Sequence, residues 1–217
     1  MAQALPKGAQ ALPVEPDWSL EAQLWARGCS PVAGVDEAGR GALAGPVVAA
    51  AVILPLGTHP YRDSKTLPPE RREELAANIR CEALAWAVGI AEPAEIDELN
   101  VLRATHLAAG RALVELRRTL PPGGLVTDYL WLEERAQVLP VAQADCRSYQ
   151  AAAAGILAKV TRDELMRALA LEHPEYGFEQ NKGYGAPAHL QALEAVGPCR
   201  VHRASFAPVT RTLASSA

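Results

Sequence analysis

Apolar runs and amphipathic segments alternate along most of the chain. Short runs rich in Val, Ile, Leu and Ala, bounded by Gly, Pro or acidic residues, predict buried strands. Segments with apolar residues at every third or fourth position predict helices. The expected strands span 30–39, 44–55, 84–93, 125–130 and 137–145, and the expected helices span 18–28, 67–83, 93–100, 100–119 and 149–173, with one short helix near 189.

The order of these elements predicts an α/β fold with one mixed sheet. Strands and helices alternate only in part, which favours a mixed sheet with helices on its faces. The 217 residues suit one main domain over 18–172, followed by a small helical C-terminal extension over 173–210. The Ala-, Pro- and Gln-rich segment 1–17 is expected to be a disordered tail, and 211–217 a second tail.

Composition narrows the possible function classes. Hydrophobic residues make up 49% of the chain, enough for a sizeable core. The formal net charge is -4, so a polyanionic partner would need local positive charge or metal ions. The four cysteines form no C-x-x-C pair and are expected to be free thiols. Neither a signal-peptide core nor a membrane-spanning run is present, which predicts a soluble, cytoplasmic protein.

Acidic residues lie at the ends of three of the expected strands. Asp36 and Glu37 are adjacent, and Asp128 and Asp145 come at the ends of two later strands. A carboxylate at the end of an apolar strand is partly desolvated and needs a partner charge or a metal. Gathered at one sheet edge, such residues would suit Mg²⁺ or Mn²⁺, and two such ions would suit phosphodiester hydrolysis. Each single Asp has the alternative role of capping a helix or starting a turn.

A Gly-Arg-Gly tripeptide at 39–41 follows directly after the acidic pair. Its glycines allow the backbone to approach a ligand closely and leave Arg40 free to bind phosphate, although a plain tight turn has the same sequence. With Ala44, the glycines also match the dinucleotide-binding pattern G-x-G-x-x-A, and Asp63 lies about 20 residues on. That alternative, an oxidoreductase, requires a helix at the glycines, where this chain has a strand-like run with Pro46.

Other polar residues give weaker signals. Tyr184 lies among glycines, where its ring could be presented to a sugar or base. His202 is expected to be structural or to face a phosphate. Six acidic residues are expected on solvated helical faces: Asp97, Glu98, Glu133, Glu134, Asp163 and Glu164. Six basic residues could form a local phosphate patch, although scattered Lys and Arg usually lie on the solvated surface: Lys65, Lys159, Arg162, Lys182, Arg200 and Arg203.

Five sequence blocks occur in an order typical of one enzyme family. The blocks are GVDEAGRGALAGPVVAAAVIL from 34, DSKTL from 63, AKVTRD from 158, YGFEQNKGYG from 176 and HRASFAPV from 202. Together they resemble the type 2 ribonuclease H family, ribonuclease HII, over roughly residues 31–209.

This resemblance implies both the fold and the reaction. The implied fold is a ribonuclease H-like five-stranded mixed sheet flanked by helices, with 18–172 as catalytic domain and 173–210 as a substrate-binding extension. The implied enzyme is a metal-dependent endonuclease that hydrolyses the RNA strand of RNA–DNA hybrids and nicks 5′ to single ribonucleotides embedded in duplex DNA. It would leave 3′-hydroxyl and 5′-phosphate ends, in keeping with ribonucleotide excision repair and DNA replication.

The resemblance also implies a metal site. Asp36, Glu37, Asp128 and Asp145 match the four carboxylates of the family, which hold two divalent ions, Mg²⁺ or Mn²⁺. Asp36 is expected to bridge the two ions.

Substrate-binding residues are implied in the same way. Gly39, Arg40 and Gly41 match the family's turn that senses the ribose 2′-hydroxyl, the group that distinguishes RNA from DNA. Lys65 matches a lysine near the scissile phosphate, and Tyr184 matches a tyrosine at the RNA–DNA junction. The implied partner is nucleic acid, with no membrane, and the protein is expected to be a monomer.

The chain departs from the family's usual pattern at four positions. Tyr129 stands where the family usually has glycine, and Ala186 where threonine is usual. Cys146 and Gly155 stand where small hydroxyl residues are common. None of these departures removes a carboxylate. A nucleic-acid-binding module without catalysis is a further alternative, against which the presence of all four carboxylates argues.

Overall fold

The computed structural model describes residues 15–215 of the chain. Its centre is one five-stranded mixed sheet in the order β3-β2-β1-β4-β5, in which β1 is antiparallel to β2 and parallel to β4. The strands are β1 (Val32–Ala38), β2 (Val47–Ile53), β3 (Ala85–Ala91), β4 (Gly124–Asp128) and β5 (Gln137–Val141). The α-helices are α1 (Ser19–Trp25), α2 (Pro69–Glu82), α3 (Pro93–Leu99), α4 (Val101–Thr119), α5 (Tyr149–Glu172), α6 (Phe178–Asn181), α7 (Pro187–Val196) and α8 (Ala207–Ser215), and the 3₁₀ helices are η1 (Ser64–Thr66), η2 (Ala144–Cys146) and η3 (Pro174–Tyr176).

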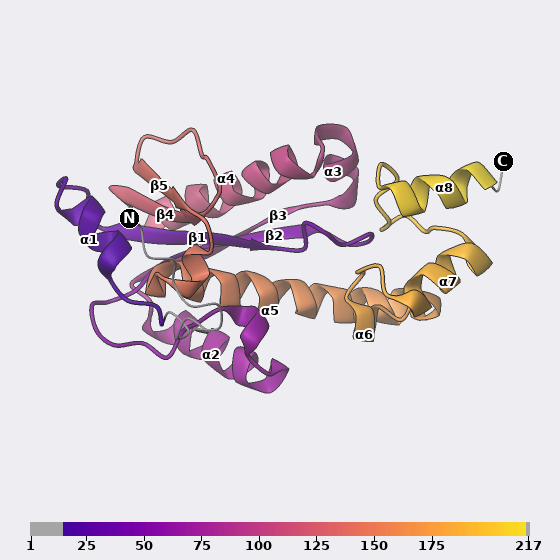
Figure 1. Ribbon diagram of the computed structural model, residues 1–217, viewed down its shortest axis with the longest axis horizontal. Coiled ribbons are helices and arrows are strands. Elements are labelled where there is room, and N and C mark those ends of the chain that lie inside the picture. The colour runs from indigo at the N-terminus through magenta and orange to yellow at the C-terminus, as the bar shows by residue number, and fades with distance from the viewer. Residues whose placement is uncertain (1–14, 216–217) are drawn as a thin grey trace, which may run out of the picture.

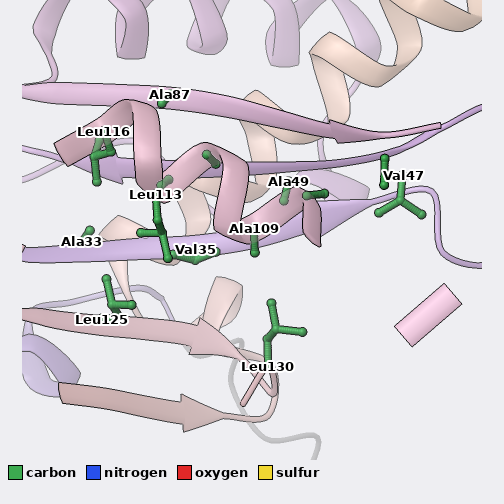
Figure 2. Packing of buried hydrophobic residues seen from close by; sticks show 14 of the residues in the cluster. Ala33, Val35, Val47, Ala49, Ala87, Ala109, Leu113, Leu116, Leu125 and Leu130 are labelled. Carbon is green, nitrogen blue, oxygen red and sulfur yellow. The ribbon is translucent and has the colours of Figure 1, made fainter. Parts of the chain in front are cut away.

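Helices cover both faces of the sheet (Figure 1). α4 packs on one face beside α3, and α5 and α2 pack on the other. Figure 2 shows the first of the two cores, in which Leu113 and Leu116 of α4 meet buried side chains of β1, β2 and β4. In the second core, Ile156 and Leu157 of α5 meet the opposite side of the sheet. Because β2 is buried along its whole length, its sequence is a continuous apolar run rather than an alternating one.

The C-terminal extension forms a smaller core against the end of α5. Phe178, Leu193 and Val209 bury their side chains there together with Leu43 and Met166. Figure 1 shows the extension at one end of the molecule, beyond the end of the sheet. It therefore packs directly against the segment that follows the acidic pair of β1.

The predicted fold class is confirmed, and each expected strand and helix is present with shifted ends. The dinucleotide-binding alternative is wrong, because β1 ends at Ala38 and leads through a turn into β2 without a helix at Gly39. The long apolar run after Pro46 forms a central strand, which leaves no room for the helix that such a site requires.

The expectation of solvated helical faces is wrong for several acidic residues. Glu133 and Glu134 lie in the loop between β4 and β5 rather than on a helix. Asp163 is buried and pairs with Lys159 at 2.7 Å. The carboxylate of Asp97 accepts hydrogen bonds of 2.8 and 2.9 Å from backbone N–H groups just before α8, so it ties α3 to the C-terminal extension.

The predicted tails are described only in part. Residues 1–14 of the expected N-terminal tail lie outside the described residues. Asp17 forms a backbone bridge with Ser148, and α8 continues to Ser215 through most of the second expected tail. Between residues 15 and 215, no helix combines the length and the apolar character needed to cross a membrane.

Helix α7 begins without a side-chain cap. Its N-cap residue is Ala186, whose extended backbone suits a capping residue but whose methyl group cannot accept a hydrogen bond from the first turn. Ala186→Ser is therefore expected to stabilise the protein by about 1 kcal/mol and to raise Tm by a few degrees. Thermal unfolding measures the change. Ala188→Ser, inside the same helix, is the matched control; an equal gain there would show that capping is not the cause.

Candidate active site

Four carboxylates come together at one edge of the sheet. β1 and β4 run parallel, and Asp36 and Asp128 each lie one residue beyond the last paired position, so both strands deliver a carboxylate to the same edge. Glu37 follows Asp36 on β1, and Asp145 lies in η2, shortly after β5. The sequence-based expectation that these four residues gather is therefore met by the topology.

Burial makes the ionised form of this cluster unfavourable. Asp36 is 7% exposed; burial raises its pKa well above the usual range, and the negative charges of Glu37, Asp128 and Asp145 raise it further. Burial also raises the pKa of Glu37, an effect that the Arg40 charge opposes. The pKa of Asp145 is raised by burial and then by the charge of Asp63. Such a cluster is stabilised by positive charge placed among its oxygens.

The oxygen atoms of the cluster fit divalent cations. Asp36 Oδ1 accepts a 2.7 Å hydrogen bond from the Glu37 N–H, and Asp128 Oδ1 accepts one of 3.2 Å from the Ala144 N–H. Glu37 Oε1 is paired with Arg40 at 3.2 Å, but Glu37 Oε2 is buried with no hydrogen-bond partner. An orphaned buried carboxylate oxygen among other carboxylates is a natural ligand for a hard cation.

A fifth acidic residue, Asp63, adjoins the cluster. Ligand atoms of Asp63, Asp145 and Cys146 lie within 4.8 Å of one another. Asp63 also caps η1 by accepting a 2.9 Å hydrogen bond from the Lys65 N–H, and Lys65 Nζ lies 3.7 Å from Asp145 Oδ2. The sequence patterns gave no reason to place Asp63 here, because only the fold brings the segment before η1 next to η2.

Arg203 of the C-terminal extension stabilises the turn at 39–41 through hydrogen bonds to its backbone. Gly39 has a φ of 98°, and a Cβ atom there would lie 2.0 Å from the Nε atom of Arg162, so only glycine fits. Arg203 is fully buried. Its guanidinium donates hydrogen bonds of 2.8 to 3.2 Å to the carbonyl oxygens of Gly39, Arg40, Gly45 and Pro46.

Arg162 of α5 is a second buried arginine beneath the same segment. It donates to the carbonyl oxygens of Pro46, Lys182 and Ala44 at 2.9, 3.0 and 3.1 Å. Burial lowers the pKa of Arg162, and burial together with the Arg162 charge lowers the pKa of Arg203 to about 9. The expectation that these two arginines face phosphate is wrong, since both are enclosed and bind backbone carbonyls.

One cleft of about 580 Å³ connects the carboxylates, the turn and Tyr184. Tyr184 is 37% exposed, and the centroid of its ring lies 5.1 Å from Arg162 Cζ and 5.7 Å from Lys159 Nζ. Of the predicted site residues, Gly41 and Asp145 are not in the cleft lining. The others are: Asp36, Glu37, Gly39, Arg40, Lys65, Asp128 and Tyr184.

Local positive charge is present despite the acidic composition. Lys65 and Lys159 line the cleft, and Lys182 lines an adjoining cleft that shares Lys159. Arg72, which the sequence patterns did not single out, also lines both clefts. Arg200 is exposed and pairs with Glu172 at 2.6 Å. Because the net charge of the protein is negative, a polyanionic partner needs positive side chains close to where it binds, and the cleft provides them.

Two of the departures from the family pattern affect the surroundings of the carboxylates. A Cβ atom on Gly155 of α5 would lie 2.3 Å from Asp36 Oδ2, so a side chain there requires another orientation of the carboxylate. Tyr129 has a φ of 52°, in the left-handed region that favours glycine, and its side chain is exposed directly after Asp128. Gly155 and Tyr129 therefore make the surroundings of Asp36 and Asp128 in this chain different from the usual pattern of the family.

Comparisons with known proteins agree with this geometry. The sequence profile described as Ribonuclease HII matches residues 33–209. Ribonuclease HII of Thermus thermophilus is 54% identical over 192 residues, covering 88% of this chain and 93% of that relative. Ribonuclease HII of Chlamydia trachomatis serovar D is 47% identical over 207 residues, covering 94% of each chain. Among solved structures, the ribonuclease H2 from Pyrococcus horikoshii OT3 is similar with a TM-score of 0.72 at 26% identity, covering 85% of this chain and 97% of that one. The chain therefore belongs to the ribonuclease HII family and is a ribonuclease H enzyme.

Proposed function

We propose that this enzyme hydrolyses the RNA strand of RNA–DNA hybrids and nicks duplex DNA 5′ to a single embedded ribonucleotide. The products carry a 3′-hydroxyl and a 5′-phosphate. The observation that carries this proposal is the cleft itself, in which carboxylates on neighbouring strands lie beside the turn at 39–41 and Tyr184. The relatives named ribonuclease HII, which match nearly the whole chain, support it.

Two divalent cations, Mg²⁺ or Mn²⁺, would be held by Asp36, Glu37, Asp128 and Asp145. Bound there, the two cations supply an activated water and stabilise the charge on the leaving oxygen. Support comes from the orphaned Glu37 oxygen and from the mutual repulsion of the carboxylates. Oxygen donors of this kind favour hard ions over soft ones.

The turn at 39–41 would recognise the ribose through its backbone. The carbonyl groups of Gly39 and Arg40 face Arg203, and in a trans peptide the N–H points the opposite way, so the N–H groups of Arg40 and Gly41 face away from the protein interior. A Cβ atom on Gly41 would meet nothing within 4 Å, so this backbone is open to close approach. The 2′-hydroxyl is the group to be read there, since it alone separates RNA from DNA.

Two side chains would position the nucleic acid strand. Lys65 is largely exposed at the cleft, near Asp145, where its charge can meet the phosphate that is cleaved. The half-exposed ring of Tyr184 would stack at the RNA–DNA junction, as aromatic rings do on sugars and bases. We further propose that the enzyme acts as a monomer in the cytoplasm.

Cleavage of a DNA duplex that holds one ribonucleotide tests this proposal. We expect a nick on the 5′ side of the ribonucleotide with Mg²⁺ or Mn²⁺, no product with chelator, and no cleavage of the all-DNA duplex. End-labelled strands on a sequencing gel report the position and the chemistry of the ends. Asp36→Asn, purified in the same way, controls for contaminating nuclease.

Each other outcome removes a different part of the proposal. Cleavage of a long RNA–DNA hybrid without cleavage at the single ribonucleotide would leave the nuclease intact but reject the junction role of Tyr184 and the turn. Binding of both substrates without cleavage in either metal would indicate the catalytically silent module instead.

A further inference from the structure

The backbone of Tyr184 is fixed on both sides of its Cα atom. The Gly183 carbonyl before it accepts hydrogen bonds of 2.7 and 3.2 Å from the N–H groups of Leu43 and Ala44. The Tyr184 carbonyl accepts one of 2.8 Å from the Ala186 N–H and lies 2.9 Å from His189 Nδ1. The first pair ties Tyr184 to the segment after the turn at 39–41, and the second ties it to α7.

Behind His189 lies a chain of buried polar contacts. His189 Nε2 lies 3.0 Å from His202 Nε2, and His202 Nδ1 accepts a 3.0 Å hydrogen bond from the Cys199 N–H. His189 is fully buried and His202 is 5% exposed. The contacts therefore link Cys199, His202 and His189 to the Tyr184 carbonyl in one line, which we name the histidine relay.

The two ends of the histidine relay determine where its protons lie. His202 Nδ1 lies 3.0 Å from the Cys199 backbone nitrogen and 3.3 Å from both the carbonyl oxygen and Sγ of Cys199. The shortest of these contacts is to an N–H that can only donate, which favours Nδ1 as acceptor and the proton of a neutral ring on Nε2. That proton points to His189 Nε2, which must accept, so the His189 proton is on Nδ1. Nδ1–H then faces the Tyr184 carbonyl, which can only accept. The reverse order would leave two lone pairs facing each other at Tyr184.

The surroundings keep both rings neutral. Tyr176 and Phe178 pack against both imidazoles, with ring centroids between 4.6 and 6.2 Å apart. Burial lowers the pKa of His189, and burial with the neighbouring His189 lowers the pKa of His202 to about 4. A proton added to either ring would place two N–H groups against each other.

We propose that His189 and His202 are positioning residues, which set the orientation of Tyr184 in the cleft through this fixed order of protons. The inference rests on the proposed role of Tyr184 at the RNA–DNA junction. Tyr184 is 37% exposed, and its ring lies beside the long side chains of Arg162 and Lys159, so the backbone that carries the ring contributes to its direction. With Ala186 unable to cap α7 through a side chain, His189 is the side chain that joins this helix to Tyr184.

Nitrogen NMR of the full chain tests the proton order directly. With ¹⁵N-labelled histidine at neutral pH, we expect His202 to carry its proton on Nε2 and His189 to carry its proton on Nδ1, both neutral. Assignment follows from His189→Asn and His202→Asn. Two rings with the same tautomer, or a protonated ring at neutral pH, would overturn the proposal. This measurement needs no substrate and is independent of the enzyme's reaction.

Two substitutions of His189 distinguish the contributions of its two ring nitrogens. The amide nitrogen of Asn takes the place of Nδ1 and keeps the contact with Tyr184, whereas the amide of Gln reaches the place of Nε2 and keeps only the contact with His202. Both leave one buried partner unsatisfied, so a merely structural role predicts similar losses for both. A positioning role predicts that His189→Gln lowers junction cleavage relative to hybrid cleavage by about tenfold, and that His189→Asn stays near the wild-type ratio.

Tyr184→Ala and His106→Asn complete the experiment. Tyr184→Ala should reproduce the changed ratio of His189→Gln. His106→Asn, in a separate pocket lined by α4 and β3, should leave the ratio unchanged. Equal ratios in the Asn and Gln variants would refute the positioning role. If Tyr184→Ala itself left the ratio unchanged, the junction role in the proposed function would fail, while the NMR result would still decide the proton order.

Discussion

Replacing Asp36 by Asn is expected to abolish cleavage and, at the same time, to stabilise the protein in the absence of divalent ions. Asn keeps the oxygen that accepts the 2.7 Å hydrogen bond from the Glu37 N–H, so the end of β1 retains its geometry. It loses a charge that would help to hold the two cations. We expect cleavage to slow by about a thousandfold or more, because metal ions supply several kcal/mol of transition-state stabilisation.

Stability should move in the opposite direction because Asp36 is buried among like charges. Its pKa is raised by burial and by the charges of Glu37, Asp128 and Asp145, so its ionised form opposes folding. Removal of this charge is expected to raise the free energy of unfolding by about 1 kcal/mol with chelator present. Urea denaturation and single-turnover cleavage measure the two effects.

An exposed carboxylate provides the control for Asp36. Glu115 on α4 pairs with Arg118 at the surface, and Glu115→Gln should leave both activity and stability nearly unchanged. Retained activity in Asp36→Asn, or a loss of activity that merely follows a loss of stability, would contradict the assignment of this residue to the metal site.

Replacing Arg203 by Met is expected to destabilise the protein by about 3–5 kcal/mol, because several buried carbonyl groups lose their donors at once. Met fills much of the same volume without donating a hydrogen bond. The affected carbonyls belong to the turn at 39–41 and to the segment that leads into β2, at Gly39, Arg40, Gly45 and Pro46. Substrate affinity should fall together with stability, since the same turn would read the ribose.

Arg200→Met is the matched control for Arg203→Met. Arg200 lies three residues away in sequence, is largely exposed and makes one ion pair with Glu172, so its loss should change the free energy of unfolding by less than about 0.5 kcal/mol. Denaturant titrations of both variants compare the two. If both unfold at the same midpoint, the turn does not depend on Arg203.

The fold could be predicted from sequence because the central strands β1, β2 and β4 are buried on both faces. Runs such as Val47–Ile53 leave little choice between strand and helix, and the helices that cover them have regular apolar spacing. Errors arose where local sequence is ambiguous. Glu133 and Glu134 occur in a stretch without strong periodicity, and the loop there is fixed by its ends in β4 and β5.

The carboxylates could be predicted for a similar local reason, since each lies at or shortly after the end of an apolar strand. The residues that support the site could not. Arg203 and Arg162 look like surface cations in sequence, and their burial depends on partners up to 164 residues away. Asp63 and Asp97 likewise acquire their contacts only when distant segments meet. Sequence patterns report the face of an element that is buried, but not which distant backbone group a polar side chain will bind.

The separation in sequence between Arg203 and the turn that it holds has a consequence for protein synthesis. The hydrogen bonds from Arg203 to Gly39 and Gly45 span 164 and 158 residues. A ribosome that adds about 5–20 residues per second needs roughly 8–30 seconds to travel from the turn to its partner. Throughout that interval the nascent chain includes the residues of β1, which carries Asp36 and Glu37, but lacks the donor that stabilises the turn. The turn is therefore completed only after Arg203 has been synthesised and has left the ribosome.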